Sequence, residues 1–196
     1  MKTMTRTVIK REPRTTAVYI PAELLDADAG QVQEKVRITL LMGQPVTTPC
    51  LIPVLHSSTP ACINNPFMVN GDCYKLTAMS FGNAHGAVFV DDVDALDLEV
   101  IGAALGTHVL FPVGASIVFV EAAGKGDLKA RLWQNEIGEI PFTPEAVSVA
   151  GTAAMMLQKV LGTSANISMG GEDFQVKWDR CGSGISLTGP ASMVAD

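Results

Sequence analysis

The side chains best suited to acid–base chemistry are His85, in the segment Gly-Asn-Ala-His, and Glu145, in the segment Thr-Pro-Glu-Ala. Histidine titrates near neutral pH, so His85 could act as an acid or a base at a cleft, paired with Gln134. The structural alternative is a histidine at a strand end whose hydrogen bond is satisfied. Glu145 could act as a general acid, or it could only stabilise the first turn of a helix through the helix dipole. His85 and Glu145 are therefore the candidate catalytic residues.

Asn83 and Thr143 are candidates for contacting a small-molecule substrate. Each also has a purely structural interpretation. A Gly-Asn pair makes an ordinary turn. A threonine before proline is a good helix N-cap, because its hydroxyl can accept a hydrogen bond from the first turn. Both interpretations stay open for both residues.

We expect neither a metal site nor a redox pair. An acidic group precedes a predicted helix, where it suits the positive end of the helix dipole better than it suits a metal; it consists of Asp91, Asp92 and Asp94. The cysteines form no Cys-x-x-Cys pair, and we expect each to be a free thiol buried as a small hydrophobic side chain; they are Cys50, Cys62, Cys73 and Cys181.

The elements that would position these residues are mostly short strands. In 128–132 and 174–178, apolar and polar residues alternate, which is typical of antiparallel strands with one buried face. Turns at Gly170-Gly171 and Gly182-Ser183-Gly184 separate further strands. The predicted strands are Thr5–Lys10, Thr16–Ile20, Lys35–Leu41, Tyr74–Ser80, Ala87–Val90, Ser116–Glu121, Leu128–Trp133, Phe174–Trp178 and Ile185–Thr188.

Two helices are predicted, over Asp97–Leu105 and Pro144–Leu161, the second ending at Gly162. The second helix has no charged residue from Ala146 to Leu157, and a helix that is apolar all round is buried all round. We therefore predict an α+β fold in which a mostly antiparallel sheet curls into a barrel around a central apolar helix. The alternative is a helix packed between the sheet and a dimer partner.

Composition excludes several classes of function. The chain has 196 residues and a net charge of −6, which fits a single domain over 1–196 and argues against a nucleic-acid or anionic-membrane partner. The uncharged stretch from Ile38 to Gly71 contains too many prolines for a membrane helix. The basic N-terminus has no apolar run behind it, so we expect a cytoplasmic protein without a signal peptide.

Three segments resemble diaminopimelate epimerase: Ser80–Glu121, Leu128–Glu139 and Gly170–Ala191. The most specific features are Gly-Asn-x-His followed by VFVDDVD, a helix leading into His-x-x-Phe-Pro, and the closing LTGPA. The resemblance covers residues 35–196 and only the family's C-terminal lobe, while 1–34 match poorly. It implies a sheet curled around a central helix. In that family the active site lies between two such lobes, and each lobe contributes one cysteine.

The chain departs from the family at the positions that would carry this chemistry. Thr143 occupies the position of the second cysteine, and a hydroxyl is far too weak an acid for thiol-type proton exchange. Pro144 removes a backbone N–H and Glu145 adds a negative charge where the family binds a carboxylate. Ser116 replaces an asparagine, and Gln134-Asn135 replaces a Glu-Arg pair. The implied substrate-binding residues are Asn83, Ser116, Gln134, Asn135 and Thr143.

We therefore expect an enzyme of small-molecule biosynthesis that is not an amino-acid epimerase. A cyclase or isomerase acting on a largely apolar substrate fits best, with an intramolecular [4+2] ring closure as the leading reaction, because that chemistry needs mainly shape and orientation. One alternative is proton-transfer isomerisation by His85 or Glu145 without cysteine. Another is a non-catalytic binding or structural lobe. We expect no cofactor and no metal, and we expect a homodimer in which a second copy covers the exposed lobe face.

Overall fold

The computed structural model describes residues 5–11, 14–20, 36–55, 60–124 and 126–191. They form a two-stranded sheet, a ten-stranded sheet and two helices, α1 (Leu98–Gly106) and α2 (Pro144–Met156). The small sheet pairs β1 (Thr5–Arg11) with β2 (Arg14–Ile20). The large sheet contains β3 (Val36–Gly43), β4 (Asn65–Val69), β5 (Asp72–Ser80), β6 (Ala84–Val90), β7 (Ser116–Ala122), β8 (Asp127–Gln134), β9 (Gly138–Ile140), β10 (Ser164–Met169), β11 (Glu172–Asp179) and β12 (Gly184–Ala191).

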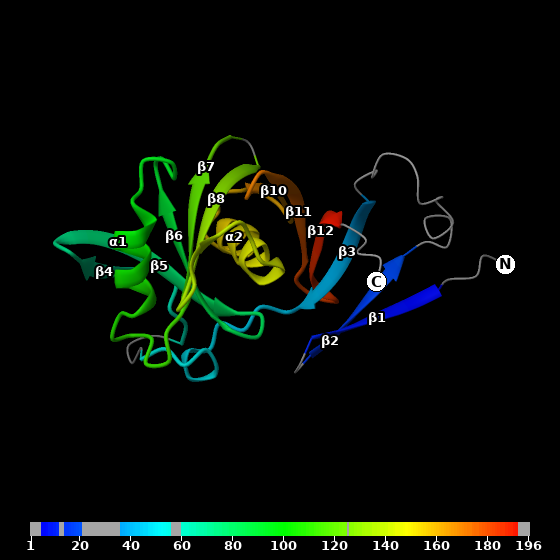
Figure 1. Cartoon of the computed structure of the whole chain (residues 1–196), viewed down its shortest axis with the longest axis horizontal. Coiled ribbons are helices and arrows are strands. Elements are labelled where there is room, and N and C mark those ends of the chain that lie inside the picture. Colours follow the sequence, from blue (N-terminus) through cyan, green and yellow to red (C-terminus); the bar gives the residue numbers. More distant parts are fainter. Residues whose placement is uncertain (1–4, 12–13, 21–35, 56–59, 125, 192–196) are drawn as a thin grey trace.

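The large sheet curls around α2 but is not closed, so the predicted barrel is wrong (Figure 1). The strand order is β3-β12-β11-β10-β8-β7-β6-β5-β4, with β9 added beside β8, and the two edge strands β3 and β4 do not pair with each other. The sheet is mixed, because β6 pairs with β7 and β8 with β10 in parallel. The remaining pairs are antiparallel, as predicted.

A second hydrophobic core explains why the sheet stays open. On β7, Val118 and Val120 face the core around α2, whereas Ile117 and Phe119 face a separate core that includes buried residues of α1. Phe67 and Val69 of β4 belong to this second core. The edge at β4 is therefore used to cover α1, and it is not available to meet β3. Burial on both faces also explains the continuous apolar sequence of β7.

The prediction that the second helix is central and buried is confirmed. Every residue of α2 from Ala146 to Met155 is buried, and sheet strands surround the helix (Figure 1). Gly151 allows the closest approach, since a Cβ there would lie 2.8 Å from the Cβ of Val176. The helix ends at Met156 and not at Leu161. Gln158 takes a positive φ of 57°, and the chain turns back so that Val160 is buried in the core.

The first helix is confirmed with a shift of one residue. Asp97 is its N-cap, and its side chain accepts a hydrogen bond from the Val100 amide at 3.3 Å. Neither helix in the described part of the chain has the length and apolar character needed to cross a bilayer. A short 3-10 helix, η2 (Pro49–Leu51), precedes β4.

Cysteine burial differs from the prediction. All four described cysteines are free thiols, as expected, but only Cys62 is buried. The other three lie on exposed segments of the chain, and they are Cys50, Cys73 and Cys181. Burial raises the pKa of the Cys62 thiol, so this residue behaves as a small hydrophobic side chain of the second core.

Candidate functional site

The strand register brings three of the predicted residues to one end of the sheet. His85 near the start of β6 pairs with Ser116 at the start of the parallel strand β7. Gln134 ends β8, which runs antiparallel to β7, so it lies at the same end. All three point to the α2 face, because side chains alternate along a strand and the residues two positions further into each strand belong to the core around α2. Those core residues are Ala87, Val118 and Leu132.

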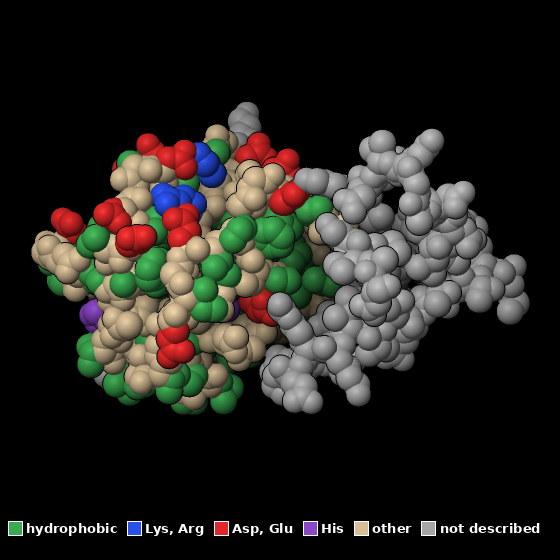
Figure 2. All heavy atoms as spheres, in the orientation of Figure 1, with side chains coloured by type: hydrophobic (Ala, Val, Ile, Leu, Met, Phe, Trp, Pro, Cys, Tyr) green, Lys and Arg blue, Asp and Glu red, His purple; other side chains and the backbone are tan. Residues whose placement is uncertain are grey.

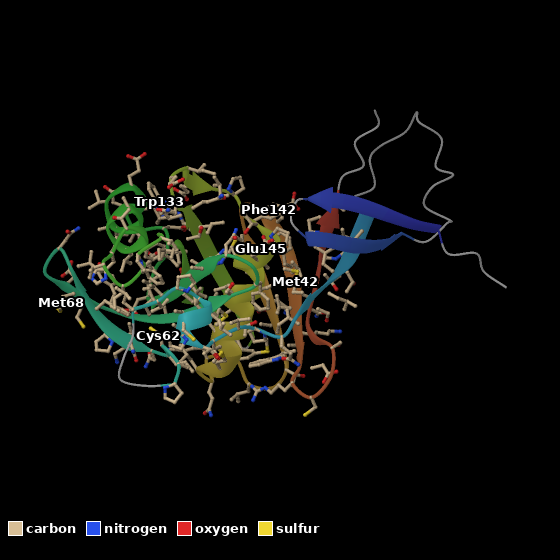
Figure 3. The ribbon with its side chains drawn as sticks, turned by 90° about the horizontal axis from the view of Figure 1, so that it is seen from below. Met42, Cys62, Met68, Trp133, Phe142 and Glu145 are labelled. Carbon is tan, nitrogen blue, oxygen red and sulfur yellow. The ribbon has the colours of Figure 1, made fainter. Side chains whose placement is uncertain are left out.

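The N-terminus of α2 lies at this end as well. The carboxylate of Glu145, in the first turn, is close enough to raise the pKa of His85. Figure 3 shows Glu145 at the start of α2, with Phe142 and Met42 on the same side of the molecule. Phe142 packs edge-on against Phe174, with ring centroids 4.8 Å apart. Met42 and Phe142 are partly exposed where they pack on the core around α2, and we call this pair the apolar rim.

His85 is held as a neutral imidazole. It is 3% exposed, and burial lowers its pKa, whereas the hydrogen bond to Asn83 and the Glu145 carboxylate act in the opposite direction. Its Nδ1 lies 3.0 Å from the backbone oxygen of Asn83. Because a carbonyl oxygen can only accept, Nδ1 carries the proton and the lone pair lies on Nε2. Among the described residues, Nε2 has no hydrogen-bond partner, so it is available as a base.

Thr143 is engaged as the N-cap of α2. Its Oγ1 accepts a hydrogen bond from the Ala146 amide at 3.1 Å, and the Val147 amide donates to the Thr143 carbonyl at 3.1 Å. Pro144 has no N–H to offer. Within the described part of the chain, only the Glu145 amide of this first turn is left without a hydrogen-bond partner. A helix N-terminus that ordinarily offers several donors therefore offers one.

The remaining two candidates, Asn83 and Asn135, lie at the margin of this group. Asn83 is exposed in the turn between β5 and β6, and its backbone carbonyl orients His85. Asn135 follows β8, and its amide packs against Gly114, two residues before Ser116. Neither side chain makes a described hydrogen bond to His85 or Glu145. The amide of Asn135 is therefore directed at the loop that leads into β7.

Sequence analysis missed the contacts that fix the segment before α2. Arg131 donates from Nε and Nη2 to the two carboxylate oxygens of Glu139, at 2.8 and 2.9 Å. Its Nη1 donates to the backbone oxygens of Val93 and Leu96, at 2.7 and 3.1 Å. The bidentate bond to Glu139 raises the pKa of Arg131. This network joins β8 and β9 to the acidic loop before α1, and the only sequence signal for it is an Arg and a Glu eight residues apart.

The acidic group before α1 has a structural use. Asp92 accepts hydrogen bonds from the backbone amides of Asp94 and Ala95, at 2.8 and 3.3 Å, and Asp94 pairs with Lys129. In the described ranges, no three or more His, Cys, Asp or Glu side chains gather where they could hold a metal ion. Asp92 and Asp94 therefore shape the loop that leads into α1.

Two cavities lie away from the candidate residues. One of 290 Å³ lies beside Arg131 and Glu139, and one of 550 Å³ lies on the outer face of the sheet, next to Asn166 and Gln175. Neither is lined by His85 or Glu145. Figure 2 shows hydrophobic side chains and an acidic side chain in a recess beside the position that α2 has in Figure 1. The recess in Figure 2 is open to solvent, and we take it as the candidate site.

Comparison with known proteins confirms the resemblance seen in the sequence. The chain is 33% identical over 180 residues to the diaminopimelate epimerase of Desulforapulum autotrophicum and 32% identical over 170 residues to that of Leptospira biflexa. The chain is a homologue of diaminopimelate epimerases. The two alignments cover 92% and 87% of the chain but only 62% and 60% of these epimerases. No protein-family profile matches the chain.

Solved structures show how the epimerase-like fold is shared. A PhzF-family phenazine biosynthesis protein of Bacillus anthracis superposes with a TM-score of 0.55 at 14% identity, covering 95% of this chain and 65% of that protein. A hydroxyproline epimerase of Agrobacterium vitis superposes with a TM-score of 0.60 at 10% identity, covering 95% of this chain and 56% of that protein. At these identities the likeness concerns the fold alone. The chain again spans less than two thirds of the proteins that it resembles.

Proposed function

We propose that the chain carries an isomerase-type site that moves a proton on a small molecule without a catalytic cysteine. The observation that supports this most is the state of His85, a neutral imidazole whose Nδ1 proton is held by Asn83 and whose Nε2 has no partner among the described residues. The Glu145 carboxylate acts on this ring by favouring its charged form. The homologues are epimerases, and the structural neighbours include a hydroxyproline epimerase, so isomerisation agrees with the relatives of the chain.

The proposed reaction begins at a carbon next to a carbonyl group. Nε2 of His85 takes a proton from that carbon, and the electron pair of the C–H bond moves onto the carbonyl oxygen. The unpartnered Glu145 N–H is the donor for that oxygen. Return of the proton to the same carbon or to a conjugated one gives the isomer, so the reaction consumes no co-reactant.

The carbonyl group in this scheme is an amide, ester or ketone. Removing a proton beside a carboxylate would create a doubly charged intermediate, which needs several donors or cations to stabilise it. Here the helix N-terminus offers one N–H, and Glu145 adds a negative charge. A neutral carbonyl group gives a singly charged intermediate, which this recess can hold.

A ring closure such as [4+2] on a largely apolar substrate is the second candidate. It is favoured by the apolar rim of Met42 and Phe142 beside the recess. Such a reaction depends on how the two reacting ends are oriented and not on an acid–base residue. It therefore predicts that replacing His85 leaves turnover nearly unchanged, which separates it from proton transfer.

We further propose that two copies of the chain associate through this face. The partly exposed Met42 and Phe142 lie around the recess, and a two-fold pair would bury them and exclude water from Glu145. Closure of the site by a second copy would also supply the walls that the open recess lacks.

The test is exchange of carbon-bound hydrogen in deuterium oxide, followed by proton NMR. Protein is incubated with L-phenylalaninamide and with 4-phenyl-2-butanone, and loss of the C–H signal is compared with buffer. We expect exchange with the native chain, loss of at least about tenfold in His85→Gln because the base is gone, and full activity in His108→Gln, a matched histidine outside the site. Absence of exchange with both compounds, or exchange that survives His85→Gln, contradicts the proposal.

A further inference from the structure

We infer that Glu145 makes the recess select substrates that carry a protonated amine and reject those that carry a carboxylate. The inference concerns the ligand of the proposed isomerase site and rests on that proposal for the location of the site. It follows from the charges around the start of α2, which are the reverse of those at an ordinary helix N-terminus.

The attraction of the helix N-terminus for anions has been removed. Anion binding there needs free backbone N–H groups. In this chain, Pro144 has none, and the Ala146 N–H is bonded to Oγ1 of Thr143. The Val147 N–H is bonded to the Thr143 carbonyl. Among the described groups of this turn, the Glu145 N–H is therefore the one donor without a partner. The carboxylate carried by Glu145 in this same turn then opposes a second anion.

The charge of Glu145 is not neutralised within the described part of the chain. No described Lys or Arg forms an ion pair with Glu145. Four Lys and Arg side chains contact other groups instead. Arg131 binds Glu139, Lys129 binds Asp94, Lys159 lies over the Phe89 ring, and Arg180 lies over the Trp178 ring. Glu145 is also the charged group that acts on His85. An incoming ligand therefore meets a negative recess.

His85 gives the second, independent indication of a ligand. The residue is 3% exposed and its Nδ1 is engaged by Asn83, whereas no hydrogen bond from a described residue reaches Nε2. Nε2 and the Glu145 carboxylate both accept hydrogen bonds, so the complementary ligand donates them. A protonated amine donates to the carboxylate and places a polarised C–H bond near Nε2.

The chemistry of proton transfer agrees with this choice. A positively charged amine on the reacting carbon makes its proton more acidic, and a neutral carbonyl group keeps the intermediate from becoming a dianion. The ligand class is therefore an amine beside an amide, ester or ketone. Zwitterionic amino acids lack the neutral carbonyl group, and their carboxylate would be repelled by the carboxylate of Glu145.

Isothermal titration calorimetry with three matched probes tests the inference. L-Phenylalaninamide carries the amine and a neutral carbonyl group, 3-phenylpropionamide lacks the amine, and L-phenylalanine carries a carboxylate. We expect saturable binding of phenylalaninamide and at least about tenfold weaker binding of the other two. Glu145→Gln should weaken the binding of phenylalaninamide by about tenfold and leave the affinity for 3-phenylpropionamide unchanged. Glu99→Gln, a first-turn acid of α1, is the matched control and should change nothing.

Three results would overturn the inference: phenylalanine binding as tightly as its amide, equal affinities in the native chain and Glu145→Gln, or no saturable binding of the amide below about 10 mM. If Glu145→Gln fails to fold by circular dichroism, Glu145→Asp, which keeps the charge but shortens its reach, should give intermediate affinity. Binding in the expected order without C–H exchange would refute proton transfer but uphold the charge selection. C–H exchange in the absence of any preference for the amine would refute the charge selection but leave the proposed proton transfer standing.

Discussion

The ring nitrogen Nδ1 of His85 lies 3.0 Å from the backbone oxygen of Asn83, two residues earlier in the chain. This bond fixes which nitrogen carries the proton and leaves the lone pair on Nε2. The bond needs no side chain from Asn83, because the acceptor is the backbone. The turn between β5 and β6 is therefore what prepares His85 as a base, and the identity of residue 83 matters through the turn that it forms.

Replacing Thr143 by alanine should destabilise the chain by about 1 kcal/mol, because the Ala146 amide would lose its cap. Thr143→Ser keeps the hydroxyl and should stay close to the native value. Urea denaturation measures both. Equal stability of the alanine and native proteins would show that the hydroxyl has another use, such as contact with a substrate.

Charged residues placed in the middle of α2 should prevent folding. Gly151 lies against Val176 and Ala153 is fully buried, so Gly151→Glu or Ala153→Lys would leave an unpaired charge in the core. Leu161→Glu is the control, because Leu161 is 86% exposed and should tolerate the charge. Thermal melting followed by circular dichroism gives the answer. A native transition in Gly151→Glu would mean that the helix is not enclosed by the sheet.

The chain should not epimerise diaminopimelate or common amino acids. By the sequence resemblance, Thr143 takes the position at which we expect the family's second cysteine. The first turn of α2 has one N–H without a described partner and carries the charge of Glu145. Incubation in deuterium oxide should give no exchange at the α-carbon above the buffer rate. Clear exchange on diaminopimelate would show that the epimerase reaction survives without the thiol.

Light scattering at micromolar concentration should give a mass about twice the 20.7 kDa of one chain. Met42 and Phe142 are partly exposed around the recess. Met42→Glu should therefore shift the protein toward the monomer, whereas Met68→Glu, at an exposed position on the far edge strand β4, should not. A mass near 20.7 kDa for the native chain would refute the dimer.

The position of α2 was predictable because Thr143 and Pro144 mark its start and the next residues lack any polar face. Its early end was not, because burial of Val160 turns the chain after Met156. β10 went unrecognised although Ala165, Ile167 and Met169 alternate inward, since its serines and asparagine have weak strand preference. Pro66 concealed β4, and proline is tolerated there because β4 is an edge strand.

Closure of the sheet and the shape of the site depend on contacts between distant segments. Nothing local to β4 shows that Phe67 packs in the core around α1, and that packing is what keeps the sheet open. The influence of Glu145 on His85 joins residues 60 positions apart, and no local sequence pattern indicated it. The orientation of Asn135 toward Gly114 could not be read from either segment alone.

The account depends most on the pairing of His85 with Glu145, and ¹⁵N NMR of the His85 ring tests this directly. In the native chain the ring should be protonated at Nδ1 at neutral pH, with a pKa below the usual value of about 6.5, because burial disfavours the charged form. In Glu145→Gln the pKa of His85 should fall further, since the carboxylate that favours the imidazolium is gone, whereas Glu99→Gln should leave it unchanged. A proton on Nε2, or a pKa that does not respond to Glu145→Gln, would contradict the acid–base pairing on which the proposed function rests.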